Sequence, residues 1–177
     1  AFVGVIAKCF DEGYDVAVIF TKNSVALAEQ SIKRLKSDFS MPIDRNRLYV
    51  WDIIKLQEGL LTGYILDQKQ IFVVKKESKN LIALERVFNN PVLQKKKVLI
   101  IDDEADQASV SFIADKDKEE GFDMAKVAGA ISNFRHQLKG NNSYLQVTAT
   151  PYSLYLQPED MTINQTEYAP LRPAFTH

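Results

Sequence analysis

Short runs of β-forming residues alternate with helix-like segments along most of the chain. Within these runs the apolar residues are often consecutive, as in "YDVAVIF" and "KVLIID". A strand that is apolar on both faces is typical of a parallel sheet that is covered on both sides. The predicted strands are Tyr14–Phe20, Arg47–Trp51, Gln70–Lys76, Lys97–Asp102 and Ser143–Thr150.

Helical patterns lie before and between these strands. Gly13 marks the end of the first helix. Ser24 or Asn23 can cap the second helix, and Ser78 can cap a later one. Strands that alternate with helices at these spacings predict an α/β fold, with helices on both faces of a mostly parallel sheet. The predicted helices are 1–12, 24–36, 52–61, 78–89 and 123–139, and a charged loop is expected at 115–121.

Composition narrows the class of protein. The chain has 177 residues, which suits one domain, or one domain with an appendage. Its 22 Lys and Arg balance 23 Asp and Glu, so any contact with nucleic acid is expected to be local. The single cysteine, Cys9, excludes a disulfide framework and predicts a reducing, cytoplasmic compartment. No apolar run reaches the roughly eighteen residues of a membrane span, so no membrane partner is expected.

The stretch "VLIIDDEAD" runs from a predicted buried strand directly into four acids. Carboxylates near a core cost several kcal/mol each unless something neutralises them, and a divalent cation is the obvious candidate. Asp102–Asp106 also falls at the carboxyl end of a parallel strand, which is where open α/β sheets bind their ligands. The sequence therefore predicts metal-assisted chemistry at this position.

The letters Asp103-Glu104-Ala105-Asp106, followed later by "VTATP", resemble the first motor lobe of superfamily-two helicases of the DEAD/DEAH type. The resemblance covers roughly residues 1–152. It implies a RecA-like three-layer sandwich that hydrolyses ATP with Mg²⁺. The forms "IDDEADQAS" and "TATPY" are most similar to the Z-one subfamily of helicase-like ATPases, found beside restriction and repair enzymes.

The same resemblance assigns roles to individual residues. Asp103, with Glu104 beside it, is expected to hold the Mg²⁺ of the nucleotide. Glu104 is expected to position or deprotonate the attacking water. Asp106 is expected to link this site to Thr148 and Thr150 of the "TAT" segment. Phosphoryl transfer needs neutralised charge and an oriented water, and one Mg²⁺ and a neighbouring carboxylate supply both.

A second segment resembles the nucleic-acid motif of these helicases. In "VAVIFTKNSVALAEQ", Thr21, Lys22 and Asn23 lie at the turn between strand and helix. They are expected to contact the sugar-phosphate backbone of a nucleic acid, with DNA favoured over RNA. The resemblance also implies a second RecA-like lobe as a partner.

One motif of the family is missing. The spacing G-x-x-x-x-G-K-[ST] of the phosphate-binding loop occurs nowhere in the chain. The expectation is a fragment that begins just after that loop, so that the lobe is truncated at its N-terminal strand. Residues 1–152 are then a partial lobe and 153–177 a tail leading out of it. By itself such a fragment is expected to be inactive as an ATP hydrolase.

Two other functions remain open for the acids. A metal-dependent nuclease would use them directly, but restriction-type nucleases add a Glu/Asp-x-Lys on a strand, which is not found downstream of Asp103. A non-catalytic receiver-like domain would need a phospho-accepting Asp further on, where the next strand carries Thr148-Ala149-Thr150 instead.

Three other charged residues, Asp102, Lys75 and Lys76, are given no catalytic role. Asp102 is interpreted as a loop acid that caps the next helix as readily as it serves the site, and it is left out of the catalytic set. Lys75 and Lys76 end a strand; phosphate contact is conceivable there, but solvated charge is the preferred interpretation.

Overall fold

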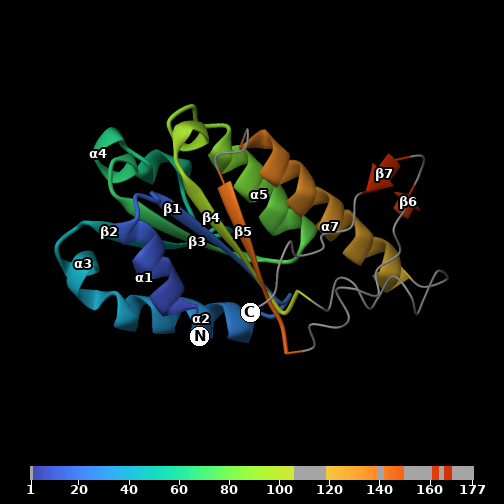
Figure 1. Ribbon diagram of the computed structural model, residues 1–177, viewed down its shortest axis with the longest axis horizontal. Helices are drawn as coiled ribbons and strands as arrows, with labels where there is room; N and C mark the ends of the chain where they lie inside the picture. The colour runs from blue at the N-terminus through green and yellow to red at the C-terminus, as the bar shows by residue number, and fades with distance from the viewer. Residues whose placement is uncertain (1, 106–118, 139–141, 150–160, 164–165, 169–177) are drawn as a thin grey trace.

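Five parallel strands form the central sheet of the protein (Figure 1). The computed structural model describes residues 2–105, 119–138, 142–149, 161–163 and 166–168. The strand order is β2-β3-β1-β4-β5, and all five predicted strands are present. Their bounds are β1 Val16–Thr21, β2 Leu48–Asp52, β3 Lys69–Lys75, β4 Val98–Asp103 and β5 Asn142–Val147. An antiparallel pair, β6 Met161–Ile163 and β7 Thr166–Tyr168, lies in the segment expected to be a tail.

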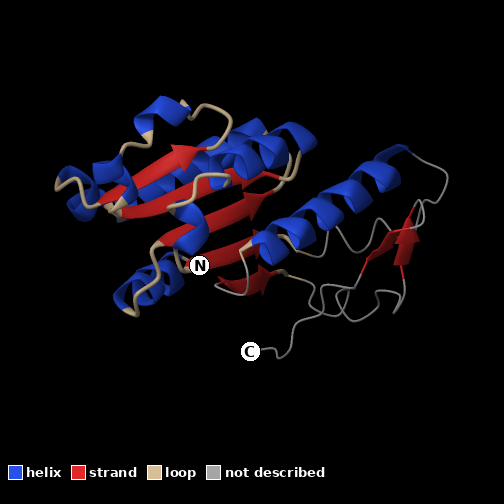
Figure 2. Ribbon diagram, turned by 90° about the horizontal axis from the view of Figure 1, so that it is seen from above, coloured by secondary structure: helices blue, strands red, loops and turns tan. Residues whose placement is uncertain are grey.

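Helices cover both faces of the sheet, so the fold has three layers (Figures 1 and 2). Helices α1 and α2 pack on one face, and α5 and α7 pack on the other. The predicted α/β three-layer sandwich with a parallel sheet is confirmed. The helices are α1 Val3–Asp11, α2 Val25–Asp38, α3 Ser40–Asp44, α4 Gly63–Leu66, α5 Ser78–Phe88 and α7 Glu119–Gln137, with short 3₁₀ turns η1 Glu58–Leu60 and η2 Leu93–Lys95. Among the described helices, none combines the length and the apolar character needed to cross a membrane.

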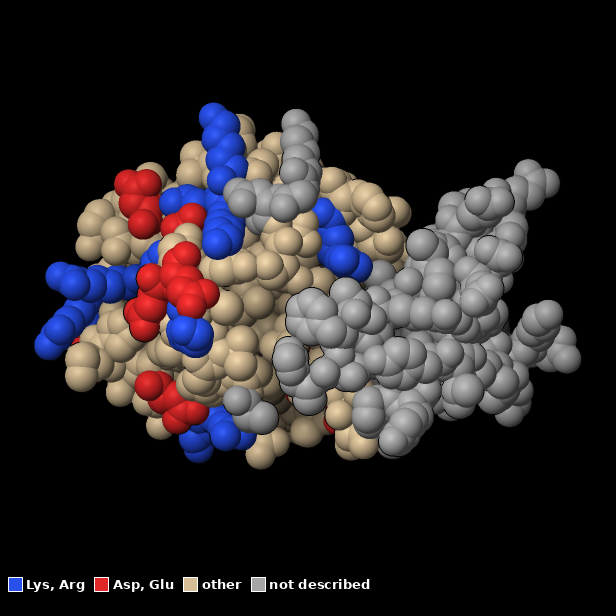
Figure 3. Space-filling model, in the orientation of Figure 1, with Lys and Arg blue, Asp and Glu red and all other residues tan. Residues whose placement is uncertain are grey.

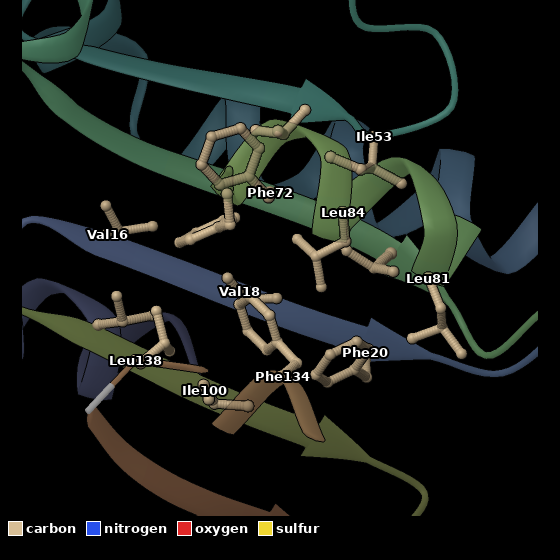
Figure 4. Packing of buried hydrophobic residues seen from close by; sticks show 14 of the residues in the cluster. Val16, Val18, Phe20, Ile53, Phe72, Leu81, Leu84, Ile100, Phe134 and Leu138 are labelled. Carbon is tan, nitrogen blue, oxygen red and sulfur yellow. The ribbon is translucent and has the colours of Figure 1, made fainter. Parts of the chain in front are cut away.

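The core on the α5/α7 face is built around aromatic rings (Figure 4). Phe134 of α7 meets Phe20 of β1 and Phe88 of α5 edge-on, with ring centroids 6.4 and 4.9 Å apart. Phe88 meets Phe72 of β3 in the same way at 5.7 Å. Edge-to-face pairs add about 0.5–1.5 kcal/mol each beyond the area that they bury. These contacts tie both helices to the middle strands.

The strand order produces a crevice at the carboxyl ends of β1 and β4. From β1 the chain passes through α2 to β2 at one edge of the sheet, and from β4 it passes through α7 to β5 at the other edge. These two helices lie on opposite faces. Open α/β sheets bind ligands where the connections diverge in this way. The acids at the end of β4 therefore lie at the switch point of the fold.

The helix predicted for 52–61 is wrong. The sheet continues past β2, because the Ile53 amide donates to the Val73 carbonyl at 3.1 Å and the Ile53 side chain is buried. Asp52 then turns the chain: its carboxylate accepts from the Ile54 amide at 3.3 Å, and its carbonyl accepts from the Lys55 amide at 3.0 Å. Sheet pairing and an Asx turn thus replace the helical pattern.

Three smaller expectations are also settled. Ser24 is confirmed as the cap of α2, because its hydroxyl accepts from the Leu27 amide at 3.4 Å. Ser78 is not a cap; it is the first residue of α5, and Glu77 occupies the cap position with no side-chain capping bond. Helix α7 begins at Glu119, so the part of the predicted charged loop at 119–121 is helical.

Candidate functional site

A cleft of about 290 Å³ opens at the switch point, on the α1/α2 side of the sheet. It draws residues from the start of α1, the end of β1, the middle of α2 and the end of β4. Two predicted groups, the acids and the turn after β1, therefore meet in one cavity. Its lining includes Val3, Thr21, Lys22, Arg34, Asp103 and Glu104.

Strand alternation and a left-handed turn place the acids at this cleft. Asp103 ends β4 on the same face as Ile101, which packs in the α1/α2 core. Glu104 has a φ of 54°, which costs a residue with a side chain about 1–2 kcal/mol. The next amide, of Ala105, donates to the Val147 carbonyl at 3.1 Å and closes the turn against β5. Glu104 Oε2 is buried and has no hydrogen-bond partner in the described part of the chain.

The structure by itself identifies no metal site around the acids in the part of the chain that it describes. Within the described ranges, no group of three or more His, Cys, Asp or Glu side chains could hold a metal. Mg²⁺ usually takes one or two carboxylates and fills its remaining positions with water and phosphate oxygens. Asp103 and Glu104 both line the cleft, so two carboxylates could contribute to such a site.

The start of α1 adds positive potential beside the acids. Its cap residue, Phe2, makes no side-chain capping bond, and its first turn contains no acid. Phe2 lines the cleft, as do Lys22 and Arg34. The first amides of a helix carry the positive end of its dipole and favour anions. The start of α1 and these two basic side chains therefore add positive potential to the cleft that contains the acids.

Asp102 lies on the other side of β4 and is closed off from the cleft. Only 2% of its surface is exposed, and Lys76 Nζ lies 2.6 Å from its Oδ1. This contact is an ion pair without well-aligned hydrogen-bond geometry. The Tyr144 hydroxyl donates to Asp102 Oδ2 at 2.6 Å. The interpretation of Asp102 as a loop acid that caps a helix is therefore wrong, because it is a strand residue with both oxygens engaged.

Lys76 is likewise not a solvated charge. It is 5% exposed, and its ammonium donates to the carbonyl oxygens of Asp103 at 2.7 Å and Glu104 at 3.0 Å. The preferred interpretation of Lys76 is thus wrong. Lys75, the residue before it, pairs with Glu77 at 3.0 Å and does not take part in this network.

Tyr144 of β5, which is half-buried, completes the group around Asp102. Burial, and then the charge of Asp102 and the hydrogen bond to it, raise the pKa of Tyr144 well above its ordinary value of 10.0. The guanidinium of Arg135 lies over the Tyr144 ring, 4.2 Å from its centroid, and opposes that shift. The hydroxyl therefore keeps its proton and remains a donor to Asp102 throughout the neutral range.

The predicted nucleic-acid residues differ in their accessibility. Thr21 is 2% exposed, and its hydroxyl donates to the Lys22 carbonyl at 3.4 Å. Lys22 and Asn23 are exposed in the loop before α2. Thr21 and Lys22 line the cleft that contains the acids. Their contact with a nucleic acid stays a prediction.

The remaining predicted residues are only partly described. Thr148 directly follows Val147, which pairs with Asp103 in the register of β4 and β5. The "TAT" segment therefore starts beside the acids, as expected from the sequence. Asp106 and Thr150 lie outside the described residues.

Sequence reasoning missed Lys76, Tyr144 and Arg34. Period-two alternation places Lys76 on the face of Val74, and Asp102 on the face of Ile100. The alternation can be read from the sequence, but only the strand order shows that Lys76 and Asp102 lie on the same face of the sheet. Tyr144 and Arg34 carried no comparable signal.

On the face seen in Figure 3, acidic and basic side chains are interspersed over α1 and α3. This agrees with the formal net charge of -1. Any electrostatic attraction of a nucleic acid on this face would therefore be local.

Comparison of the chain with protein-family models, with curated proteins and with solved structures gives no match.

Proposed function

We propose that Asp103 and Glu104 form the hydrolytic part of an Mg²⁺–ATP site in a helicase-type motor lobe that acts on nucleic acid, with DNA favoured. A second RecA-like lobe would complete the motor. One observation carries the proposal: both acids line a cleft at the switch point that they share with the start of α1 and the end of β1. An acidic pair that served only to end a strand would have no need of that cleft.

Each residue has a distinct task in this proposal. Asp103 would hold Mg²⁺, largely through water. Glu104 would orient the attacking water and accept its proton, for which its buried, unpartnered Oε2 is suited. The amides at the start of α1 would face phosphate charge. When bound, Mg²⁺–ATP supplies the phosphoryl group and the cation that neutralises its charge.

The test is steady-state ATP turnover by the intact protein, that is, by a chain that also carries the phosphate-binding loop and the second lobe that the resemblance implies. Glu104→Gln retains size and hydrogen-bonding reach but cannot accept a proton. We expect a loss in kcat of about 10²–10⁴-fold, the usual range for a general base, with ATP binding intact. Asp103→Asn should instead raise the magnesium requirement and weaken nucleotide binding.

Glu12→Gln is the matched control, because Glu12 is an exposed acid paired with Lys8 at 2.8 Å, remote from the cleft. It should turn over ATP like the wild type. Normal turnover by Glu104→Gln, with the wild type active, would contradict the proposal.

A further inference from the structure

Lys76 links two strands that do not touch each other. β1 lies between β3 and β4, so these strands are about 10 Å apart. The Lys76 side chain crosses the end of β1 and reaches three oxygens of the β4 end: Asp102 Oδ1 and the carbonyls of Asp103 and Glu104. An ammonium group has three N–H donors, and it is almost never buried unless its charge is matched. Here one carboxylate and two carbonyl dipoles match it.

The backbone of Lys76 is itself fixed. Its amide donates to the Thr21 carbonyl at the end of β1, at 2.9 Å. Just before it, the Lys75 amide donates to Oδ1 of the buried Asn80 at 3.4 Å, which joins the end of β3 to α5. The ammonium therefore extends from a well-anchored point of the sheet.

The two carbonyls held by Lys76 belong to the turn that aims Glu104. For both to face one ammonium, the chain must turn sharply after Asp103, and Glu104 adopts its left-handed φ of 54° at that point. Hydrogen bonds from a charged donor are about twice as strong as neutral ones, so they offset the cost of this conformation. Glu104, at this turn, is one of the residues that line the cleft.

We propose that Lys76 is a positioning residue for the hydrolytic step: it holds the turn at Asp103 and Glu104 and so fixes the Glu104 carboxylate in the cleft. Asp102 balances the buried charge of Lys76, and Tyr144 holds Asp102. The inference rests on the proposed function and deepens it, because it explains how the general base Glu104 is held in place. The residue that holds it directly follows another strand, β3.

The central experiment compares charge-balanced variants of the intact protein. Lys76→Met leaves Asp102 as an unpaired buried charge and can fail to fold. Lys76→Met/Asp102→Asn removes both charges, while the amide can still accept from Tyr144. We expect this double variant to fold and to lose about 10- to 100-fold in kcat, with KM for Mg²⁺–ATP unchanged, as is usual when the support of a catalytic group is removed.

A double-mutant cycle separates positioning from general destabilisation. In a Glu104→Gln background, the Lys76→Met/Asp102→Asn change should cost almost nothing further, because the general base that it positions is already gone. An equal loss in both backgrounds would show a purely structural role and overturn the inference. Lys75→Met is the matched control: it breaks the ion pair with Glu77 at the same strand end and should leave kcat unchanged.

A second readout does not depend on ATP turnover. The Ala105 amide donates to the Val147 carbonyl and reports whether the turn is held. Its hydrogen exchange should be faster in Lys76→Met/Asp102→Asn than in the wild type, and unchanged in Lys75→Met.

The two readouts distinguish the possible failures. If Glu104→Gln impairs turnover while the Lys76→Met/Asp102→Asn variant is fully active, the function stands and the positioning role is overturned. If Glu104→Gln turns over normally, the proposed function fails. In that case faster Ala105 exchange would retain Lys76 as the holder of the turn, and unchanged exchange would overturn that role too.

Discussion

The charged side chains at the carboxyl edge of the sheet have opposite environments on its two faces. On the α5/α7 face, the buried Lys76 and Asp102 pair with each other, and the half-buried Tyr144 donates to Asp102. On the α1/α2 face, Asp103 and Glu104 line a cleft, and Glu104 retains an unpartnered oxygen. Asp102 and Asp103 are adjacent residues of one strand, so alternation alone separates them. Two chemically identical side chains thus differ in role: Asp102 is part of the buried structure, whereas Asp103 is available in the cleft.

The largest expected effect on stability comes from the buried face. Asp102→Ala leaves the Lys76 ammonium without its carboxylate, and breaking a buried pair in this way typically costs about 3–5 kcal/mol. Asp103→Ala should change the free energy of unfolding far less, by about 1 kcal/mol or less, because Asp103 is only half-buried and lines the cleft. Urea denaturation of both variants measures the contrast. Equal losses would show that the two faces do not differ as described.

Tyr144→Phe tests the same face with a smaller change. The ring is retained, but Asp102 Oδ2 loses the donor that lies 2.6 Å away. A buried acceptor left without a partner costs about 1–3 kcal/mol. Chemical denaturation at neutral pH provides the value. If Tyr144→Phe left the free energy of unfolding unchanged, water would be replacing the hydroxyl, and this side of the network would be open to solvent.

The raised pKa of Tyr144 predicts a difference at alkaline pH. The folded state holds the Tyr144 proton at pH values where the unfolded chain releases it, so stability falls as pH rises above about 10. The slope due to one group is at most about 1.4 kcal/mol per pH unit. Tyr144→Phe should lack this component, so its stability should fall less steeply than that of the wild type above pH 10. Parallel curves would contradict the buried position of the hydroxyl.

Lys22→Ala probes the open face and should have the smallest effect on folding. Lys22 is exposed, so the free energy of unfolding should stay nearly unchanged. If Lys22 meets a phosphate, the variant should bind all single-stranded DNA sequences more weakly, and the slope of log K against log salt should fall by about 0.7. Titrations at several salt concentrations measure this slope. A loss confined to one DNA sequence, or no loss, would place the contact elsewhere.

The sequence predicted the sheet and the position of the acids from local patterns. Apolar runs identified all five strands, and the acids were expected at the carboxyl end of a parallel strand, where β4 has them. Where a local pattern competed with sheet pairing, the prediction failed. Ile53 continues the hydrogen-bonded pairing with β3 and does not start a helix.

The sequence by itself thus determined which segments are strands and that carboxylates follow the fourth of them, because apolar runs and strand ends are local features. Only the tertiary structure decided which carboxylate is buried and which is available. Lys76 directly follows β3 and Asp102 lies in β4, two strands that β1 separates, and Tyr144 is 42 residues from Asp102. Strand order and register bring these groups together, and both depend on long-range packing that no local pattern encodes.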